Sequence, residues 1–150
     1  MTDYAVTHVC GHPGTYDLRG PEDKREAEQA IIASLPCHAC RRAAPMPAAE
    51  PIAGIPTQVQ LADNIRNPML AETWAELDKQ IEQARVDSRA AQVARARHQT
   101  PNIRKTFVLL QSLGQITLAQ WWVNNRRSNL QQLTRSAMKD GFLPEWFLDE

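Results

Sequence analysis

The sequence is poor in glycine and has no net charge, and each shortage argues against a class of function. Only six of the 150 residues are glycine, and none forms the glycine-rich loop that binds phosphates in nucleotide-dependent enzymes. The 17 basic and 17 acidic residues cancel, so no overall field attracts nucleic acid or an anionic membrane. No Ser-His-Asp set or pair of carboxylates on an evident scaffold is present. We therefore expect a protein that is not an enzyme.

Long apolar runs and a disulfide framework are also missing. No stretch approaches the roughly 18 apolar residues of a membrane span, and the first residues lack the basic and apolar regions of a signal peptide. The three cysteines cannot all pair with one another, and two of them form a Cys-x-x-Cys. This pattern favours a metal site in a reducing compartment. We expect a soluble, cytoplasmic protein.

What the sequence does contain is a concentration of metal-ligating residues near its start. All three cysteines and three of the four histidines lie within His8–His12 and Cys37–Cys40. Two pairs of Cys or His ligands, one from each of these segments, are typical of a structural zinc site. We predict that His8, Cys10, Cys37 and Cys40 bind zinc, with His12 as the alternative to His8. A thioredoxin-type redox role for Cys37 and Cys40 is disfavoured, because no βαβ pattern surrounds them.

The first 42 residues predict a small zinc-ribbon-like module of two strands and a helix. Residues 4–9 are rich in β-branched and aromatic side chains, a turn follows at residues 11–14, and residues 15–18 return as a second strand. Pro21, followed by Glu22 and Asp23, is typical of a helix start. The module has too few large apolar residues to be stable by burial alone, so we expect the metal to take the place of a core.

A spacer rich in proline and alanine, residues 43–56, separates this module from a helical domain at residues 57–150. We predict an α+β protein with an all-α second domain. Asn67-Pro68 indicates the start of a long helix after a shorter one from Thr57. Apolar and small residues at spacings of three and four continue this helix to about His98, and the seam that they form includes Ser88.

The second half of this helix is basic and forms one candidate binding surface. It carries Arg85, Arg89, Arg95 and Arg97, whereas the first half carries acidic residues. This order also complements the helix dipole, so a purely structural role is equally consistent with it. Arg126, Arg127 and Trp146 are further candidates for partner binding. The aromatic C-terminal segment either packs onto the helices or is a docking segment. The apolar seam of the long helix can pack within one chain or against a second copy, so both a monomer and a homodimer are consistent with the sequence.

Three motifs resemble those of small proteins carried by phages, plasmids and other bacterial mobile elements. In that family a strand leads into Cys-x-Cys-Gly-His, and a hairpin, a charged helix and Cys-x-x-Cys follow. Here His8 stands in the place of the first cysteine, and Gly11-His12 matches the Gly-His. Gln58–Arg66 (Gln-x-x-Leu-Ala-x-x-Ile-Arg) and Ala119–Arg126 (Ala-x-Trp-Trp-x-x-Asn-Arg) are similar to the internal motifs of the same proteins.

The resemblance implies zinc binding, a mobile-element origin and residence in a bacterial host cytosol, but no activity. From it we expect an interaction protein that binds a host protein or nucleoprotein complex. Inhibition of a host defence complex, an anti-CRISPR-like role, is one specific form. The alternative is a nucleic-acid-binding regulator that uses the basic half of the long helix and Asn125-Arg126-Arg127. The segment Trp122–Arg127 is similar to the Trp-x-x-Asn-Arg-Arg of homeodomain recognition helices, although the basic continuation and basic arm of that family are missing.

Overall fold

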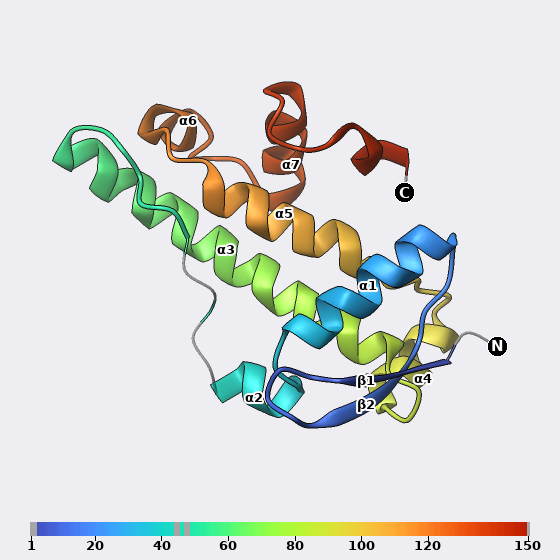
Figure 1. Cartoon of the computed structure of the whole chain (residues 1–150). Coiled ribbons are helices and arrows are strands. Elements are labelled where there is room, and N and C mark those ends of the chain that lie inside the picture. The colour runs from blue at the N-terminus through green and yellow to red at the C-terminus, as the bar shows by residue number, and fades with distance from the viewer. Residues whose placement is uncertain (1–2, 44–45, 47–48, 150) are drawn as a thin grey trace. The chain divides into compact units, whose positions relative to one another are not determined.

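Two short strands come first, and helices follow them. The computed structural model describes residues 3–43, 46 and 49–149. Strands β1 (Asp3–Thr7) and β2 (Pro13–Asp17) precede all of the helices (Figure 1). The helices are α1 (Glu22–Ser34), α2 (His38–Ala43), α3 (Pro56–Ala84), α4 (Arg89–Ala96), α5 (Ile103–Gln115), α6 (Ala119–Asn124) and α7 (Leu130–Lys139), and a 3-10 helix η1 (Glu145–Asp149) follows. The predicted α+β class is confirmed. Among the described residues, no helix is both long and apolar enough to cross a membrane.

The chain divides into two compact units that differ from the predicted division at residues 43–56. Unit 1 comprises Met1–Met46 and Ala75–Phe107, and unit 2 comprises Pro47–Trp74 and Val108–Glu150. The end of α3 is therefore grouped with the strands. The physical reason is the shortage of apolar residues in the first 42, because Leu77 and Ile81 of α3 are both 0 % exposed within unit 1. Part of the predicted spacer, residues 44, 45, 47 and 48, lies outside the described residues.

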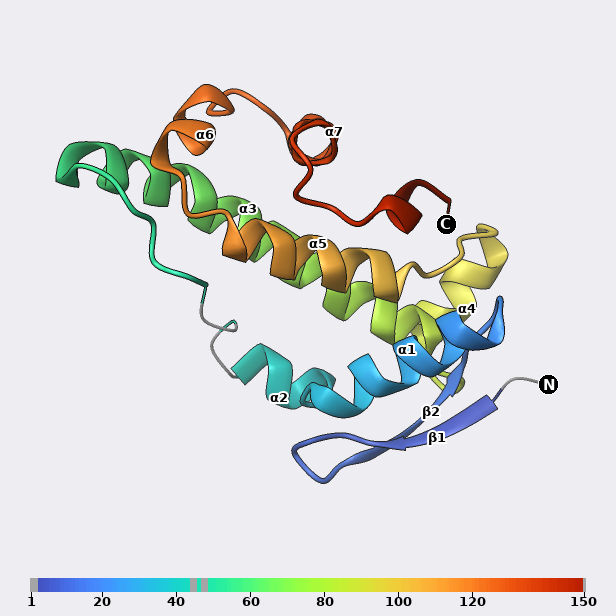
Figure 2. The same cartoon turned by 45° about the horizontal axis from the view of Figure 1, so that its top comes forward.

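Unit 1 is built on an antiparallel hairpin in which Tyr4 pairs with Tyr16 and Val6 with Gly14. Helix α1 packs on β1 (Figures 1 and 2). The other edge of β2 is extended by the chain after α3, where the Val86 amide donates a hydrogen bond to the Thr15 carbonyl (2.9 Å). A Cβ at position 14 would lie 2.9 Å from the Tyr16 ring, so the ring needs glycine there. The unit's core combines residues from all these elements: Val6, Tyr16, Leu18, Ile31, Ile32, Leu35, Leu77, Ile81, Ala84, Ala91, Ala94 and Ile103.

Helix α3 begins earlier than predicted. The sequence predicts a restart at Pro68, whereas the helix runs through Pro68 from Pro56 to Ala84. A proline inside a helix removes one hydrogen bond and costs about 3 kcal/mol. Both Pro68 and Asn64, whose carbonyl loses its donor, are exposed, so water can bind that carbonyl. Continuity of the buried face on both sides of Pro68 outweighs the local cost.

The same helix also ends earlier than predicted, because Ser88 is a helix cap and not a seam residue. The Ser88 Oγ accepts a hydrogen bond from the Ala91 amide (2.9 Å) and thereby starts α4. Its hydroxyl also donates to the carbonyl of Glu82 near the end of α3. The predicted single helix to His98 is therefore two helices, and serine at the N-cap is the local signal for the break.

Unit 2 has a larger apolar core. Trp122 is 0 % exposed, and its indole N–H donates to the Ile116 carbonyl (2.9 Å). Trp121 packs edge-on against Trp122 and donates to the Asp140 carboxylate (2.7 Å). The second half of the predicted spacer joins this unit, since the Ala53 amide donates to the Thr117 carbonyl (2.8 Å). Other buried residues of the unit are Ile52, Ala62, Leu70, Leu109, Leu110, Leu113, Ala119, Leu133, Ala137 and Phe147.

Candidate metal centre

Cys10, His12, Cys37 and Cys40 meet at one place in unit 1. Their ligand atoms all lie within 4.8 Å of one another. The first two residues belong to the loop between β1 and β2. Cys37 immediately precedes α2, and Cys40 lies in the first turn of that helix. The loop and the start of α2 therefore each supply two donors to a common centre.

The distances from the His12 nitrogen to the three sulfurs suit a tetrahedral metal site. The His12 Nδ1 lies 3.3 Å from the Cys10 Sγ, 3.3 Å from the Cys37 Sγ and 3.6 Å from the Cys40 Sγ. Zn–S bonds of about 2.3 Å and Zn–N bonds of about 2.0 Å place nitrogen and sulfur about 3.5 Å apart in a tetrahedron. Three thiolates and one imidazole are also a donor set that suits zinc. The cluster can hold a metal ion, plausibly zinc.

A tight turn aims the first two donors. The Gly11 amide donates to the His8 carbonyl (2.8 Å), and the His8 amide donates to the His12 carbonyl (3.0 Å). Gly11 has φ +87°, a conformation in which side chains are strained. Because this glycine reverses the chain between Cys10 and His12, both side chains reach the same centre.

Hydrogen bonds within the cluster shift the pKa values of all four residues. The Cys37 amide donates to the Cys10 Sγ (3.3 Å) and, with further hydrogen bonds, lowers the pKa of Cys10 to about 6. The Cys40 amide lowers the pKa of Cys37 in the same way. A hydrogen bond with Cys37 raises the pKa of Cys40 to about 11, and the Cys10 thiolate raises the pKa of His12. Metal binding requires deprotonated ligands, so it would release the protons that the cluster holds.

The structure places His12, and not His8, with the three cysteines, which corrects the predicted choice between them. His8 is 3 % exposed. Its Nδ1 donates to the Leu35 carbonyl (3.0 Å), and its Nε2 accepts from the Tyr16 hydroxyl. Burial also lowers the pKa of His8, which favours the neutral ring that this arrangement requires. Both ring nitrogens are thus used in the interior of unit 1. The feature of the sequence that indicates His12 is Gly11 between Cys10 and His12, because a glycine permits the tight turn that brings both side chains to one centre.

A buried arginine connects the Cys-x-x-Cys segment to α3. Arg41, directly after Cys40, is 2 % exposed and donates from Nε to the Asp78 carboxylate (2.9 Å). Another of its N–H groups donates to the Pro36 carbonyl, and its Nη2 lies 3.6 Å from the Glu82 carboxylate. His38, between the two cysteines, donates from Nδ1 to Asp78 as well (2.9 Å). Sequence reasoning did not identify this network, because Arg41 and its partners are far apart in the chain.

The predicted partner-binding arginines of unit 1 do not form one surface on a long helix. Arg85 lies in the break between α3 and α4 and forms ion pairs with Glu82 (3.5 Å) and Asp87 (3.0 Å). Arg89, Arg95 and Arg97 lie on α4 or at its end, and all three are exposed. Arg95 lines a small cavity, whereas Arg89 and Arg97 line a separate groove.

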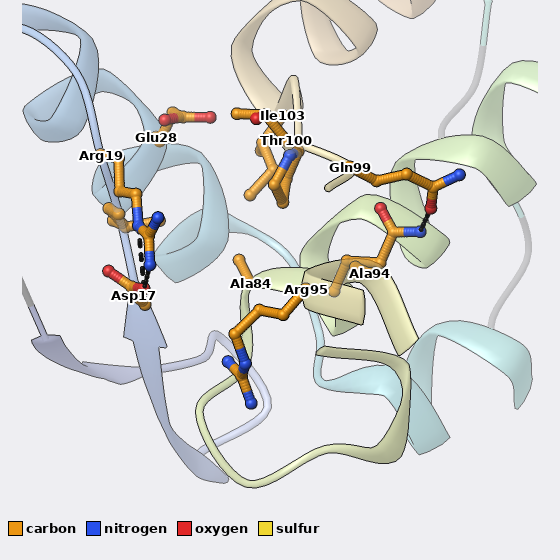
Figure 3. Close-up of a pocket in the computed structure, with 12 residues that line it drawn as sticks. Asp17, Arg19, Glu28, Ala84, Ala94, Arg95, Gln99, Thr100 and Ile103 are labelled. Carbon is orange, nitrogen blue, oxygen red and sulfur yellow. Dashed lines mark hydrogen bonds and ion pairs between the residues drawn. The ribbon is translucent and has the colours of Figure 1, made fainter. Parts of the chain in front are cut away.

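The small cavity lies between β2, α1 and the segment after α4 (Figure 3). Its volume is about 70 Å³, and the buried Glu28 forms part of its wall. Arg19, also in the wall, donates to the Asp17 carboxylate (2.9 Å). Charges of both signs already face one another in a very small space, so we assign no ligand to it.

The remaining predicted residues belong to unit 2. Helix α6 ends at Asn124, so the segment Asn125-Arg126-Arg127 forms a turn and does not continue a recognition helix. The side-chain amide of Asn125 donates to the Trp121 carbonyl (2.8 Å), and the Arg126 guanidinium donates to the Val123 carbonyl (3.1 Å). Arg127 is exposed, and Trp146 is half-buried beside Phe147.

These positions leave the cluster of Cys10, His12, Cys37 and Cys40 as the site with the best-defined chemistry. Comparison with known proteins adds no family to it, because no protein-family model, curated protein or solved structure matches the chain.

Proposed function

We propose that the protein is a non-enzymatic interaction protein in which one zinc ion has a structural role. The observation that carries this proposal is the convergence of Cys10, His12, Cys37 and Cys40 within 4.8 Å. Four protein donors complete a tetrahedral shell and leave no coordination position for water or substrate. Closed shells of this kind are typical of structural zinc, whereas catalytic zinc keeps an open position.

The proposed role of the metal is to join the hairpin loop to the start of α2. A two-stranded hairpin by itself is marginally stable, and the segment that it must meet is 27 residues further along the chain. Structural zinc binding contributes about 10–16 kcal/mol in small metal domains. The network of Arg41 with Asp78 then connects this assembly to α3.

Metal analysis of four purified variants tests the site. The unaltered protein and His98→Ala, which changes an exposed histidine outside the cluster, should contain one zinc per chain. Cys40→Ser and His12→Ala should lose or weakly retain zinc. His8→Ala should keep zinc but unfold at lower denaturant concentration, because it removes two interior hydrogen bonds.

Two results would contradict the proposal. One is unaltered protein without stoichiometric zinc. The other is a folded His12→Ala variant with full zinc affinity beside a folded His8→Ala variant that has lost it. Co²⁺ replacement gives a second readout, because thiolate-to-cobalt charge-transfer bands report how many cysteines bind the metal.

For the partner, we propose a host protein or nucleoprotein complex, with inhibition of a host defence complex as a specific form. Its support is the sequence resemblance to mobile-element proteins alone. Affinity capture from a bacterial lysate with and without nuclease separates the two classes of partner. A direct protein partner remains bound after nuclease treatment, whereas loss of all captured material would favour nucleic acid instead.

A further inference from the structure

We propose that the groove between the end of α3 and the outer face of α4 binds an acidic protein segment that carries an apolar anchor residue. This inference deepens the proposed function, since it names the chemistry of the partner and the surface that binds it. The groove is formed by unit 1 alone and is lined by Lys79, Arg89, Val93 and Arg97, with Ala90 and two glutamines completing the wall.

The charge of the groove is of one sign. Three of its lining residues are cationic, and none of those described there is acidic. The Lys79 ammonium lies 4.0 Å from the Glu76 carboxylate, which is a long ion pair. Arg89 and Arg97 make no ion pair or side-chain hydrogen bond with any described residue. The protein as a whole has no net charge, so this local excess is a feature of the groove. A partner that fills it should be acidic.

The two arginines flank an exposed aliphatic residue. Arg89, Val93 and Arg97 stand at positions i, i+4 and i+8, which places them along one face over about 12 Å. Val93 is 42 % exposed, although the opposite face of the same helix is closely packed, with Ala91 at 0 % and Ala94 at 2 %. Val93 is one of six described large apolar residues that are exposed, and it is the one that lies between these two arginines. An incoming apolar side chain would cover it, while acidic neighbours of that side chain would reach the arginines.

The wall opposite α4 is set by a contact between the two sides. The Gln83 amide group donates to the side-chain oxygen of Gln99 (3.2 Å), and both glutamines line the groove. This contact joins the side chains of α3 to the chain that follows α4. The groove is thus already formed before a partner binds, which lowers the entropic cost of binding.

A protein segment fits these features better than nucleic acid does. Single-stranded nucleic acid is typically bound by aromatic side chains that stack on the bases, and no described residue of the groove is aromatic. Phosphate contacts alone also give no role to Val93. Grooves that combine an apolar strip with charged edges are typical of sites that bind amphipathic protein segments.

The test is selection of a random dodecapeptide library on three zinc-loaded proteins. These are the unaltered chain, the groove variant Arg89→Glu/Arg97→Glu, and the control Arg135→Glu/Lys139→Glu. The control changes two exposed cations at i and i+4 on α7 and lowers the net charge by the same amount. The unaltered chain and the control should enrich peptides with several Asp or Glu residues around one large apolar residue, and the groove variant should not.

The most enriched peptide, fluorescently labelled, is then titrated with each protein. Its dissociation constant should rise about tenfold or more for the groove variant, about threefold for Val93→Ser, and little for the control. Added salt should weaken binding, as expected for exposed charge pairs. A twelve-residue oligothymidylate should not displace the peptide.

Three outcomes would overturn the inference. The first is no enrichment over the groove variant, and the second is equal weakening by the control variant. The third is tighter binding of the oligothymidylate that depends on the arginines but not on Val93, which would assign the groove to nucleic acid. Zinc content is measured on the same preparations. If the unaltered chain contains one zinc but selects no peptide, only the groove inference is wrong, whereas unaltered protein without zinc contradicts the proposed function itself.

Discussion

The two units of this chain are stabilised in different ways. Unit 2 buries Trp122 completely, packs Trp121 edge-on against it and buries a further set of mostly aliphatic residues. Unit 1 has short strands and the cluster of three cysteines and His12, and its interior includes hydrogen-bonded and charged groups. Of the described buried polar or charged residues, unit 1 contains His8, Glu28, Arg41, Glu82 and Thr106, whereas unit 2 contains Arg66 and Thr73.

The difference shows what each unit needs in order to fold. Apolar burial is not directional, so unit 2 tolerates changes that keep volume and polarity. The polar interior of unit 1 must match donors with acceptors, because an unpaired buried group costs about 1–3 kcal/mol. We therefore expect unit 1 to depend on a few specific residues and on its metal.

Removal of zinc should have the largest effect, and it should affect unit 1 but not unit 2. A chelator is expected to abolish amide protection in residues 3–43, because the metal contributes about 10–16 kcal/mol in comparable sites. Residues 109–137 should remain protected, since their core contains no metal ligand. Hydrogen exchange followed by mass spectrometry measures both regions at once, and added zinc should restore the first. Equal loss of protection in both units would contradict the comparison.

Trp122→Ala should have the opposite distribution. Loss of this fully buried indole should lower the free energy of unfolding of unit 2 by about 3–5 kcal/mol, because it leaves a cavity. Zinc content should stay at one per chain. The matched change is Leu118→Ala, at a residue 58 % exposed, which should alter stability by about 0.5 kcal/mol or less. Denaturant titration with metal analysis tests both, and a Trp122→Ala protein that has lost its zinc would argue against independent stabilisation.

Arg41→Met should weaken unit 1 by about 3 kcal/mol, because it removes the buried cation that lies beside the Asp78 and Glu82 carboxylates. The adjacent Arg42 is exposed and provides the control Arg42→Met. We expect zinc affinity, measured by competition with a chelating dye, to fall for the first variant only. Identical stability and zinc affinity in the two variants would show that the network does not support the metal centre.

The smallest expected effect concerns a helix cap in unit 2. The Asn129 side chain accepts from the Gln132 amide (2.8 Å), and the Gln132 side chain accepts from the Asn129 amide (3.0 Å). Asn129→Ala should cost about 1 kcal/mol in thermal or denaturant unfolding. Gln131→Ala, at an exposed position of the same helix, should be close to neutral. If Asn129→Ala instead reduced zinc binding, the assignment of this cap's effect to unit 2 would be contradicted.

Local signals in the sequence predicted much of this structure. The hairpin follows from the β-branched and aromatic residues on either side of Gly11 and Gly14, and the start of α1 from Pro21 and the two acidic residues after it. The three cysteines were enough to predict three of the four clustered residues, Cys10, Cys37 and Cys40. The break at Ser88 was missed because the seam of small residues continues across it, although serine is itself a capping signal.

The sequence by itself determined the donor types, the order of the elements and the apolar faces of the helices, because these depend on neighbouring residues. Only the tertiary structure decided between the two histidines. His8 and His12 are chemically equivalent donors at similar distances from Cys10 in the chain. Burial against Tyr16 and Leu35 gives both nitrogens of His8 other partners and leaves His12 facing the three sulfurs. The same holds for Arg41, since its burial with Asp78 depends on a contact between residues distant in the chain.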